Sequence, residues 1–247
     1  MFDILYRDEF LIAIHKPERW FVHKTNLDNT CGDIILNHLR DQIGQLIYPV
    51  HRLDRKTSGV LIFALDKATQ KVTNSFFSDR RVNKKYLAIV RGHFPDSKLI
   101  EIPLINDQGK LQEASTYVRS IAQTTLTSHG QNCIHCRYSL VEAEPVTGRM
   151  HQIRKHLDKV RHPIIGDRPY GCNKQNRFFK ETFGMDDLLL HAYSAELPHP
   201  CMPDLLLNIK SAPSKVFVKT AESLSLGEAL NAYQAPTDLL NKQQLPY

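Results

Sequence analysis

Short apolar segments joined by turns constrain the fold of this chain more than any other feature of its sequence. Eight such segments have the composition and length of strands, and they lie at residues 2–7, 10–16, 60–65, 84–91, 114–122, 137–145, 188–200 and 204–210. Several of them follow one another without an intervening helix, unlike the regular strand–helix alternation of a doubly wound sheet. The sequence therefore predicts an α+β protein with a mixed, mainly antiparallel sheet and flanking helices.

Helices are predicted where apolar residues recur at helical spacing. The predicted helices span residues 34–43, 67–81 and 149–160, with further helix after Pro213. In the helix at 67–81, the spacing would direct Val72, Phe76 and Phe77 toward the core.

The charge of the chain is unevenly distributed. The whole chain has 32 Lys and Arg against 26 Asp and Glu, a formal net charge of +6. Residues 51–91 and residues 146–180 each sum to +7, so the remaining residues sum to −8. Two basic segments in an otherwise acidic protein indicate a polyanionic partner bound at a defined surface. The alternative interpretation is that the two basic segments form surfaces that contact only solvent.

The most unusual segment is HRLDRKTSG at residues 51–59, directly before a predicted buried strand. Asp54 stands there among three cations, Arg52, Arg55 and Lys56. Nearby cations favour the ionised carboxylate, and an ionised carboxylate on such a loop is a candidate nucleophile or base. A loop aspartate that only forms salt bridges is the alternative.

A second polar cluster, TGRMHQIRKHL, occupies residues 147–157. A helix starting at residue 149 would turn Met150, Ile153 and Leu157 inward and carry Arg154 with them. An inward arginine needs a carboxylate partner, and Asp54 is the partner we expect. Alternatively, the methylene groups of Arg154 could lie along the apolar side of the helix while its guanidinium reaches solvent.

Several classes of function find no support in the sequence. None of the 11 glycines belongs to a G-x-G-x-x-G or G-x-x-x-x-G-K pattern, so we expect no nucleotide cofactor. A single C-x-x-C at 133–136, without a second pair, does not support a zinc site, and no metal is predicted. Five cysteines at irregular spacing indicate a reducing cytoplasm rather than a disulfide framework. No apolar run is long enough to span a membrane.

The two polar clusters resemble motifs of the RluA family of pseudouridine synthases. HRLDRKTSG matches the family's catalytic motif at all nine positions. The other matching segments are KPERWFVH (16–23), KKYLAIV (84–90), TGRMHQIRKHL (147–157), HPIIGDRPYG (162–171) and LLLHAYSAELPHP (188–200). The resemblance covers residues 2–210 and implies the family's fold, in which the sheet surrounds a central catalytic cleft. One departure is Arg19, which stands where the family's K-P-x-G motif has glycine and puts the shape of that turn in question.

The resemblance implies isomerisation of uridine to pseudouridine in RNA, without metal or cofactor. In this reaction the bond between uracil N1 and C1′ breaks, the base rotates, and a bond between C5 and C1′ forms. Asp54 matches the essential aspartate, and whether it attacks the base or the sugar carbon stays open. Arg154 matches the arginine that pairs with it. Tyr86 matches the tyrosine that stacks on the target base and helps to remove the C5 proton.

The resemblance also implies contacts with the substrate. Ile153 matches an apolar residue that lines the pocket, and Arg52 is placed to fill the space that the flipped base leaves. The expected phosphate contacts are Lys84, Lys85 and Arg55, with Lys56, Lys155 and Arg161 as further candidates.

Within the family, the segments at 41–45, 175–177 and 183–184 are most similar to members that modify uridine-65 of tRNA. We therefore expect tRNA as the partner of a cytoplasmic monomer, with no membrane and no protein partner. Action on ribosomal RNA or another tRNA site, and RNA binding without catalysis, are the alternative functions. We also expect a catalytic domain over 1–224, without an N-terminal S4 domain, and a C-terminal extension over 225–247.

Overall fold

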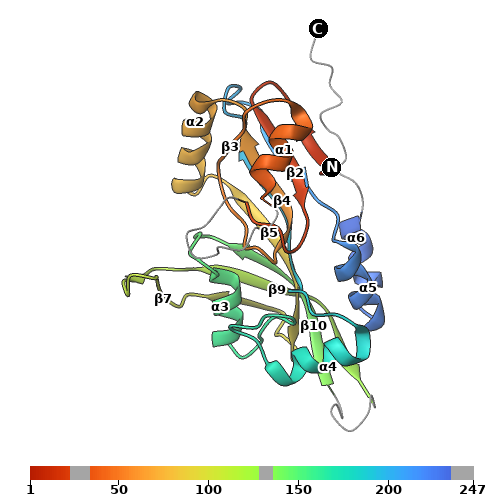
Figure 1. Cartoon of the computed structure of the whole chain (residues 1–247). Coiled ribbons are helices and arrows are strands. Elements are labelled where there is room, and N and C mark those ends of the chain that lie inside the picture. Colours follow the sequence, from red (N-terminus) through yellow and green to blue (C-terminus); the bar gives the residue numbers. More distant parts are fainter. Residues whose placement is uncertain (23–33, 128–135, 235–247) are drawn as a thin grey trace.

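A mixed ten-stranded sheet forms the centre of the molecule (Figure 1). The computed structural model describes residues 1–22, 34–127 and 136–234. The sheet strands are β1 (Ile4–Arg7), β2 (Leu11–Lys16), β3 (Tyr48–Pro49), β4 (Ser58–Ala64), β5 (Asn83–Arg91), β6 (Ser97–Ile100), β9 (Thr116–Leu126), β10 (Cys136–Pro145), β11 (Leu190–Pro198) and β12 (Leu206–Lys210). A separate hairpin consists of β7 (Leu104–Ile105) and β8 (Leu111–Gln112).

The strands run in the spatial order β1-β2-β4-β11-β5-β10-β9-β6, with β3 paired to β4 and β12 paired to β11. The pairing of β4 with β11 is parallel. Each of the other named pairings is antiparallel. The prediction of a mixed, mainly antiparallel sheet is therefore confirmed.

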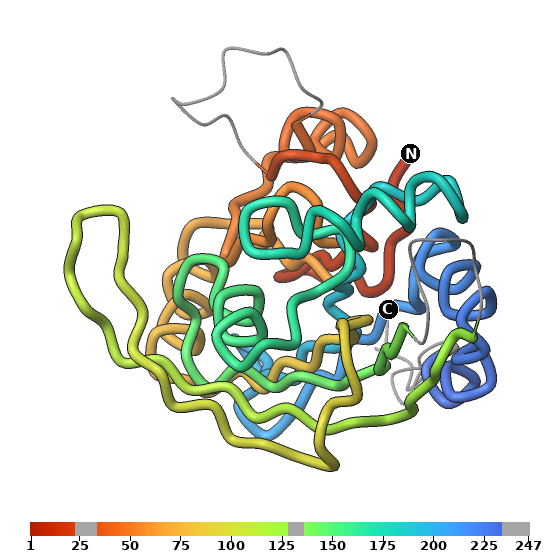
Figure 2. Tube along the Cα trace, turned by 90° about the horizontal axis from the view of Figure 1, so that it is seen from below, coloured from red at the N-terminus to blue at the C-terminus, as the bar shows by residue number. Residues whose placement is uncertain are grey.

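Six α-helices and one short 3-10 helix flank the described strands. They are α1 (Ile35–Ile43), α2 (Lys67–Ser78), α3 (Gln152–Lys159), α4 (Asn173–Phe183), α5 (Lys215–Ser223), α6 (Asn231–Gln234) and the 3-10 helix η1 (Glu228–Leu230). Figure 1 shows α1 and α2 beside β2, β3 and β4, and α3 and α4 in the other half of the molecule near β9 and β10. In Figure 2 the β7–β8 hairpin projects from the body, on the side away from α5.

In the N-terminal half, the alternation of apolar residues along the strands separates two cores. On β4, Leu61 and Phe63 pack in the cluster that contains Leu39 of α1. Val60 and Ile62 point to the other face, where they pack in the cluster of Phe76 on α2. Because successive strand residues point to opposite faces, a continuous apolar run can fill both cores.

A larger core fills the C-terminal half of the molecule. It joins residues of β5 and β10 with Leu157 of α3, Phe179 of α4 and Phe217 of α5. The sequence did not predict α4. Residues 225–234 also contact this core, through Leu226 and Leu230.

Two details of the predicted helices are wrong. Val72 is 40% exposed, because the inward side of α2 is formed by Thr69, Thr73 and Phe76 at helical spacing. Met150 is 41% exposed, because α3 begins at Gln152 and Met150 lies in the preceding turn.

Candidate active site

Asp54 lies in the loop at residues 51–57, between β3 and the first residue of β4. Its last turn is closed by a hydrogen bond from the amide of Thr57 to the carbonyl oxygen of Asp54, at 3.0 Å. Gly59 has a φ of 113°, and a Cβ there would lie 2.1 Å from the carbonyl oxygen of Ala192 on β11. Only glycine can combine this backbone conformation with so close a neighbour, so β11 fixes the end of the Asp54 loop.

Lys16, the last residue of β2, is fully buried beneath this loop. Its Nζ donates hydrogen bonds to the carbonyl oxygens of Pro17 at 2.9 Å, Arg55 at 2.9 Å and Thr57 at 2.8 Å. Burial lowers the pKa of Lys16 to about 7. The bonds to Arg55 and Thr57 hold the Asp54 loop against β2, a role for Lys16 that the sequence did not predict.

Arg154 of α3 binds two carboxylates at once. Its side chain is only 9% exposed. Nη1 donates to Oδ2 of Asp54 at 2.8 Å, while Nε and Nη2 donate to the two oxygens of Asp167 at 2.7 and 2.9 Å. Burial alone would lower the pKa of Arg154, but its bonds to Asp167 and Asp54 raise that pKa above the usual value. The guanidinium therefore stays charged, and the structure shows the ion pair with Asp54 that the sequence predicted.

The second oxygen of Asp54 faces His151. The distance from Oδ1 to Nε2 of His151 is 3.8 Å, and Nδ1 of His151 lies 3.0 Å from the hydroxyl of Tyr170. Burial lowers the pKa of His151, although the charge of Asp54 opposes this effect. His151 has a φ of 55°, a conformation that is uncommon for a residue with a side chain. This backbone conformation directs the imidazole toward Asp54.

Lys84 and Tyr86 of β5 are two residues apart and so point to the same face of the sheet, toward Asp54. Burial raises the pKa of Tyr86, and the negative charge of Asp54 acts in the same direction, so the phenol keeps its proton. Burial lowers the pKa of Lys84. Lys85 points to the opposite face, where its Nζ lies 3.6 Å from Glu142 and 3.3 Å from Glu144.

These side chains surround a cleft of about 490 Å³. Its cationic lining residues are Arg52, Arg80, Lys84, Arg149 and Arg154, and its apolar ones include Leu53, Ile153 and Leu190. The two segments of charge +7, at 51–91 and 146–180, therefore both contribute to one cleft. A cationic cleft with an apolar wall and a single carboxylate suits an anionic substrate that carries a flat apolar group.

Two predicted substrate contacts lie outside this cleft. Lys85 is on the far face of β5, as described above. Arg55 turns away from Asp54, since its Nε donates to the carbonyl oxygen of Arg19 at 3.1 Å and its guanidinium lies 4.6 Å from the ring centre of Phe21. Both residues are therefore removed from the candidate site.

The structure also explains the departure at Arg19. Arg19 has a φ of 69°, in the left-handed region that favours glycine. Its guanidinium forms ion pairs with Asp186 and, at 2.6 Å, with Asp187. These ion pairs offset the cost of the left-handed backbone, so the turn keeps a shape that would normally require glycine.

No three His, Cys, Asp or Glu side chains come together as a metal site in the described part of the chain. Cys133 and His135 of the C-x-x-C segment lie outside the described residues. Cys136 forms a disulfide bond, which the spacing of the cysteines did not predict. Over residues 1–22, 34–127 and 136–234, no helix has the length and apolar character needed to cross a membrane.

The fold and the cleft together define a mixed α+β protein whose cationic cleft contains one aspartate paired with a buried arginine. The chain belongs to the RNA pseudouridylate synthase family, whose model matches residues 10–159. The matched range includes Asp54, Tyr86 and Arg154.

Bacterial relatives share most of the chain. A tRNA pseudouridine synthase C of Vibrio cholerae is 38% identical over 81% of this chain and 86% of its own length. The protein of the same name from Salmonella typhimurium is 40% identical over 81% of each chain. One from Pectobacterium carotovorum is 39% identical, and there the match spans 56% of the relative's length.

Solved structures show the same fold. Human RNA Pseudouridylate Synthase Domain Containing 4 superposes with a TM-score of 0.69 at 26% identity, covering 90% of this chain and 93% of the human one. Human RNA Pseudouridylate Synthase Domain Containing 1 has a TM-score of 0.68 at 23% identity, covering 86% and 84%.

Proposed function

We propose that this protein converts a uridine of tRNA, at position 65, into pseudouridine and that Asp54 is its nucleophile. The geometry of Asp54 carries the proposal, because Arg154 binds Oδ2 and leaves Oδ1 facing the cleft. The names of the bacterial relatives support tRNA as the substrate. Segments 41–45, 175–177 and 183–184 resemble those of family members that modify uridine-65 of tRNA, and this resemblance supports position 65.

The cleft provides what base isomerisation needs. The Asp54 carboxylate attacks the base or the sugar carbon, and the bond between N1 and C1′ breaks. After the base rotates, C5 bonds to C1′, and the bond between Asp54 and the substrate breaks to return the free carboxylate. C5 then loses its proton while N1 gains one, so the product is an isomer of the substrate. Arg154 keeps Asp54 ionised and oriented throughout.

Tyr86 and Ile153 hold the base in this proposal. A phenol with a raised pKa is a poor base in the free enzyme, so we assign Tyr86 to stacking on the uracil rather than to removing the C5 proton as a phenolate. Ile153 supplies the apolar surface on the other side.

The target uridine must leave its helical stack to reach Asp54. The cleft volume of about 490 Å³ falls in the range of small-molecule sites. Arg52 is exposed at the rim, where it can enter the gap in the RNA stem. Arg80, Lys84 and Arg149 line the cleft and are assigned to phosphates in place of Lys85 and Arg55.

Replacement of the proposed nucleophile tests the chemistry. Asp54→Asn keeps the shape of the side chain, so the variant should fold and bind tRNA but release no tritium from tRNA that contains 5-tritiated uridine. Asp158→Asn, on the exposed side of α3, is the matched control and should react like the unchanged protein. Turnover by Asp54→Asn above a tenth of the control rate would refute the nucleophile assignment.

The position is tested by mapping pseudouridines in the RNA of a strain that lacks the gene. Loss confined to tRNA uridine-65 is the expected result. Loss in ribosomal RNA or at another tRNA position would show a different target, and no loss would favour RNA binding without catalysis. We further propose that the enzyme works as a cytoplasmic monomer.

A further inference from the structure

A second concave surface, which we call the α4 groove, lies outside the cleft. It has a volume of about 320 Å³. Its walls are Gly166 and Arg168 from the loop after α3, Asn173, Asn176, Arg177 and Lys180 from α4, and Asp186. None of these residues takes part in the proposed chemistry.

The cations of the α4 groove share one exposed side of the helix. Gln175, Phe178 and Phe179 form the buried side of α4. Arg177 and Lys180 are three residues apart on the other side, and both are exposed. Neither forms an ion pair with another residue in the described ranges.

The carboxylate of the groove is already bound to arginines. Asp186 forms an ion pair with Arg19, and Nη2 of Arg168 lies 3.7 Å from it. The Arg168 side chain is still 67% exposed. The groove therefore carries a net positive charge without a protein partner, which is the condition for binding an external anion.

A rigid loop connects the α4 groove to the catalytic cleft. Asn176 of the groove accepts a hydrogen bond from the amide of Gly166 at 2.9 Å and donates to the carbonyl oxygen of Asp167 at 2.7 Å. Asp167 in turn binds Arg154, the partner of Asp54. The groove is thus held in place relative to the reactive carboxylate.

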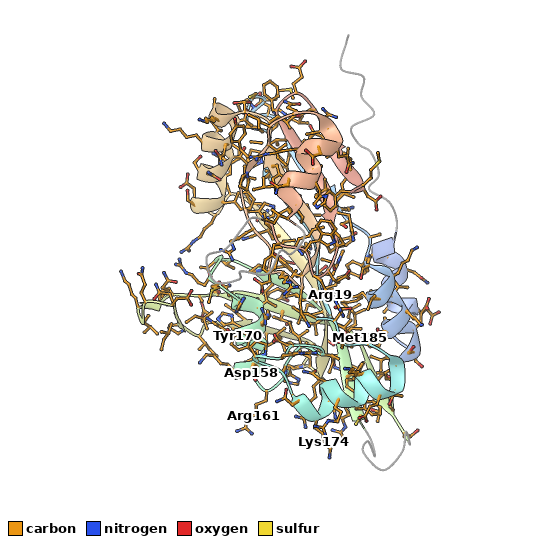
Figure 3. All side chains as sticks on the ribbon, in the orientation of Figure 1. Arg19, Asp158, Arg161, Tyr170, Lys174 and Met185 are labelled. Atoms are coloured by element: carbon orange, nitrogen blue, oxygen red, sulfur yellow. The ribbon has the colours of Figure 1, made fainter. Side chains whose placement is uncertain are left out.

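Further cations extend the basic surface beyond the groove. In Figure 3, Arg161 and Lys174 point outward below Tyr170, whose hydroxyl lies 3.0 Å from His151 of the cleft. Both are exposed, and neither is ion-paired with a described residue. A row of separate charges fits a ligand with repeating anionic groups better than a single small anion.

We propose that the α4 groove binds the phosphate backbone of the tRNA at a distance from the flipped uridine. The inference rests on the proposed tRNA substrate and adds a second point of attachment to it. Arginine and lysine contacts of this kind position the RNA without reading its bases. The groove should therefore lower the KM for tRNA and leave the chemical step unchanged.

The test compares two double variants of equal net charge. Arg177→Gln/Lys180→Gln removes two charges from the groove, and Lys215→Gln/Lys219→Gln removes two exposed charges from α5 as the control. Binding of unmodified tRNA is measured by fluorescence anisotropy between 50 and 200 mM salt, and tritium release gives kcat and KM. These salt limits are roughly the range over which phosphate contacts lose most of their strength.

The groove variant should bind tRNA about tenfold more weakly than the control at low salt. The slope of log affinity against log salt should fall by about 2, one for each lost phosphate contact. Its KM should rise by the same factor while kcat at saturating tRNA matches the control. Equal affinity, slope and KM in the two variants would overturn the groove inference.

Failure of the proposed function would look different. If the groove variant binds tRNA more weakly and with a smaller salt slope than the control, but the unchanged protein releases no tritium, the groove stands and the isomerase assignment falls. If it forms pseudouridine and the groove variant behaves like the control, the assignment stands and the groove inference falls.

Discussion

Asp167→Asn should be far more damaging to stability than Asp54→Asn, although both aspartates bind the same arginine. The Asp167 side chain is 1% exposed and accepts two hydrogen bonds from Arg154, whereas Asp54 is 24% exposed and accepts one. The amide oxygen of an asparagine at position 167 can accept one of the two hydrogen bonds from Arg154. Its NH2 group would face the second N–H of Arg154 and cannot accept a bond from it. One charge-assisted bond is lost, and the buried guanidinium keeps only Asp54 as its counterion.

The loss of one charge-assisted hydrogen bond and of the buried counterion costs about 3 kcal/mol. For a protein of this size, that energy lowers Tm by roughly 6–12 °C. Asp54→Asn should cost about 1 kcal/mol, because water reaches Asp54 and Arg154 keeps both bonds to Asp167. Urea denaturation followed by tryptophan fluorescence measures both free energies of unfolding.

Activity should separate the two variants in the reverse order. At a temperature where both are folded, Asp167→Asn should retain measurable tritium release, because Asp54 is intact, and Asp54→Asn should have none. The reasoning about the buried pair is wrong if Asp167→Asn changes the unfolding free energy by less than about 1 kcal/mol. An equal loss in both variants would also contradict it, since the burial of the two carboxylates differs.

Gly59→Ala should destabilise the fold by about 3 kcal/mol or more in urea, because its Cβ would overlap the β11 backbone. Gly109→Ala also has a positive φ, of 76°, but its Cβ would lie in open space, so it should cost less. Burial lowers the pKa of His191 to about 3. As the pH falls below 6.5, this histidine is therefore protonated in the unfolded chain while it stays neutral in the folded protein. His191 should therefore contribute about 2 kcal/mol to the fall in stability between pH 7 and pH 5, and His51, whose pKa burial also lowers to about 3, adds to this fall. His191→Gln should make the decline smaller in denaturation curves at each pH. Lys16→Met leaves the buried carbonyl group of Thr57 and the partly buried ones of Pro17 and Arg55 without this donor, so both Tm and kcat should fall, whereas Lys98→Met on exposed β6 should change neither.

Periodicity in the sequence was enough to predict the central ion pair. Ile153 and Leu157 identify the buried side of α3, and the spacing of a helix puts Arg154 on that side. A buried arginine must have a carboxylate partner, which led to Asp54, 100 residues away. Asp167 could not be found in this way, because it lies in a loop whose path depends on α4, a helix the sequence did not predict.

Proximity along the chain was a poor guide to the other charges of the site. Arg55 and Lys56 are the sequence neighbours of Asp54, yet both turn toward the Arg19 and Asp186 side of the loop. Lys84 and Lys85 look equivalent in the sequence, but the alternation of a strand sends one into the cleft and the other to Glu142. The sequence predicted a strand at β5, where successive residues point to opposite faces of the sheet. Because Tyr86 was expected in the cleft, this alternation would have excluded Lys85 from the cleft.

His151 shows a different limit of prediction. Nothing in its sequence context indicates a left-handed backbone, and a helix starting at residue 149 would have placed its side chain on another side. Its position beside Asp54 follows from the turn that precedes α3. Such conformations depend on the surrounding structure and are concentrated at functional sites.

The position of β11 in the sheet has a consequence for how the protein is made. β11 is synthesised late, yet it lies between β4 and β5 and pairs with both. Until residues 190–198 leave the ribosome, β4 and β5 each keep an unpaired edge, and the Asp54 loop lacks the backbone that fixes Gly59. The two halves of the nascent chain therefore join through contacts of long sequence separation, which form slowly. Ribosome-bound chains that end before β11 should aggregate readily, whereas longer ones can close the sheet and acquire the active site in the same step.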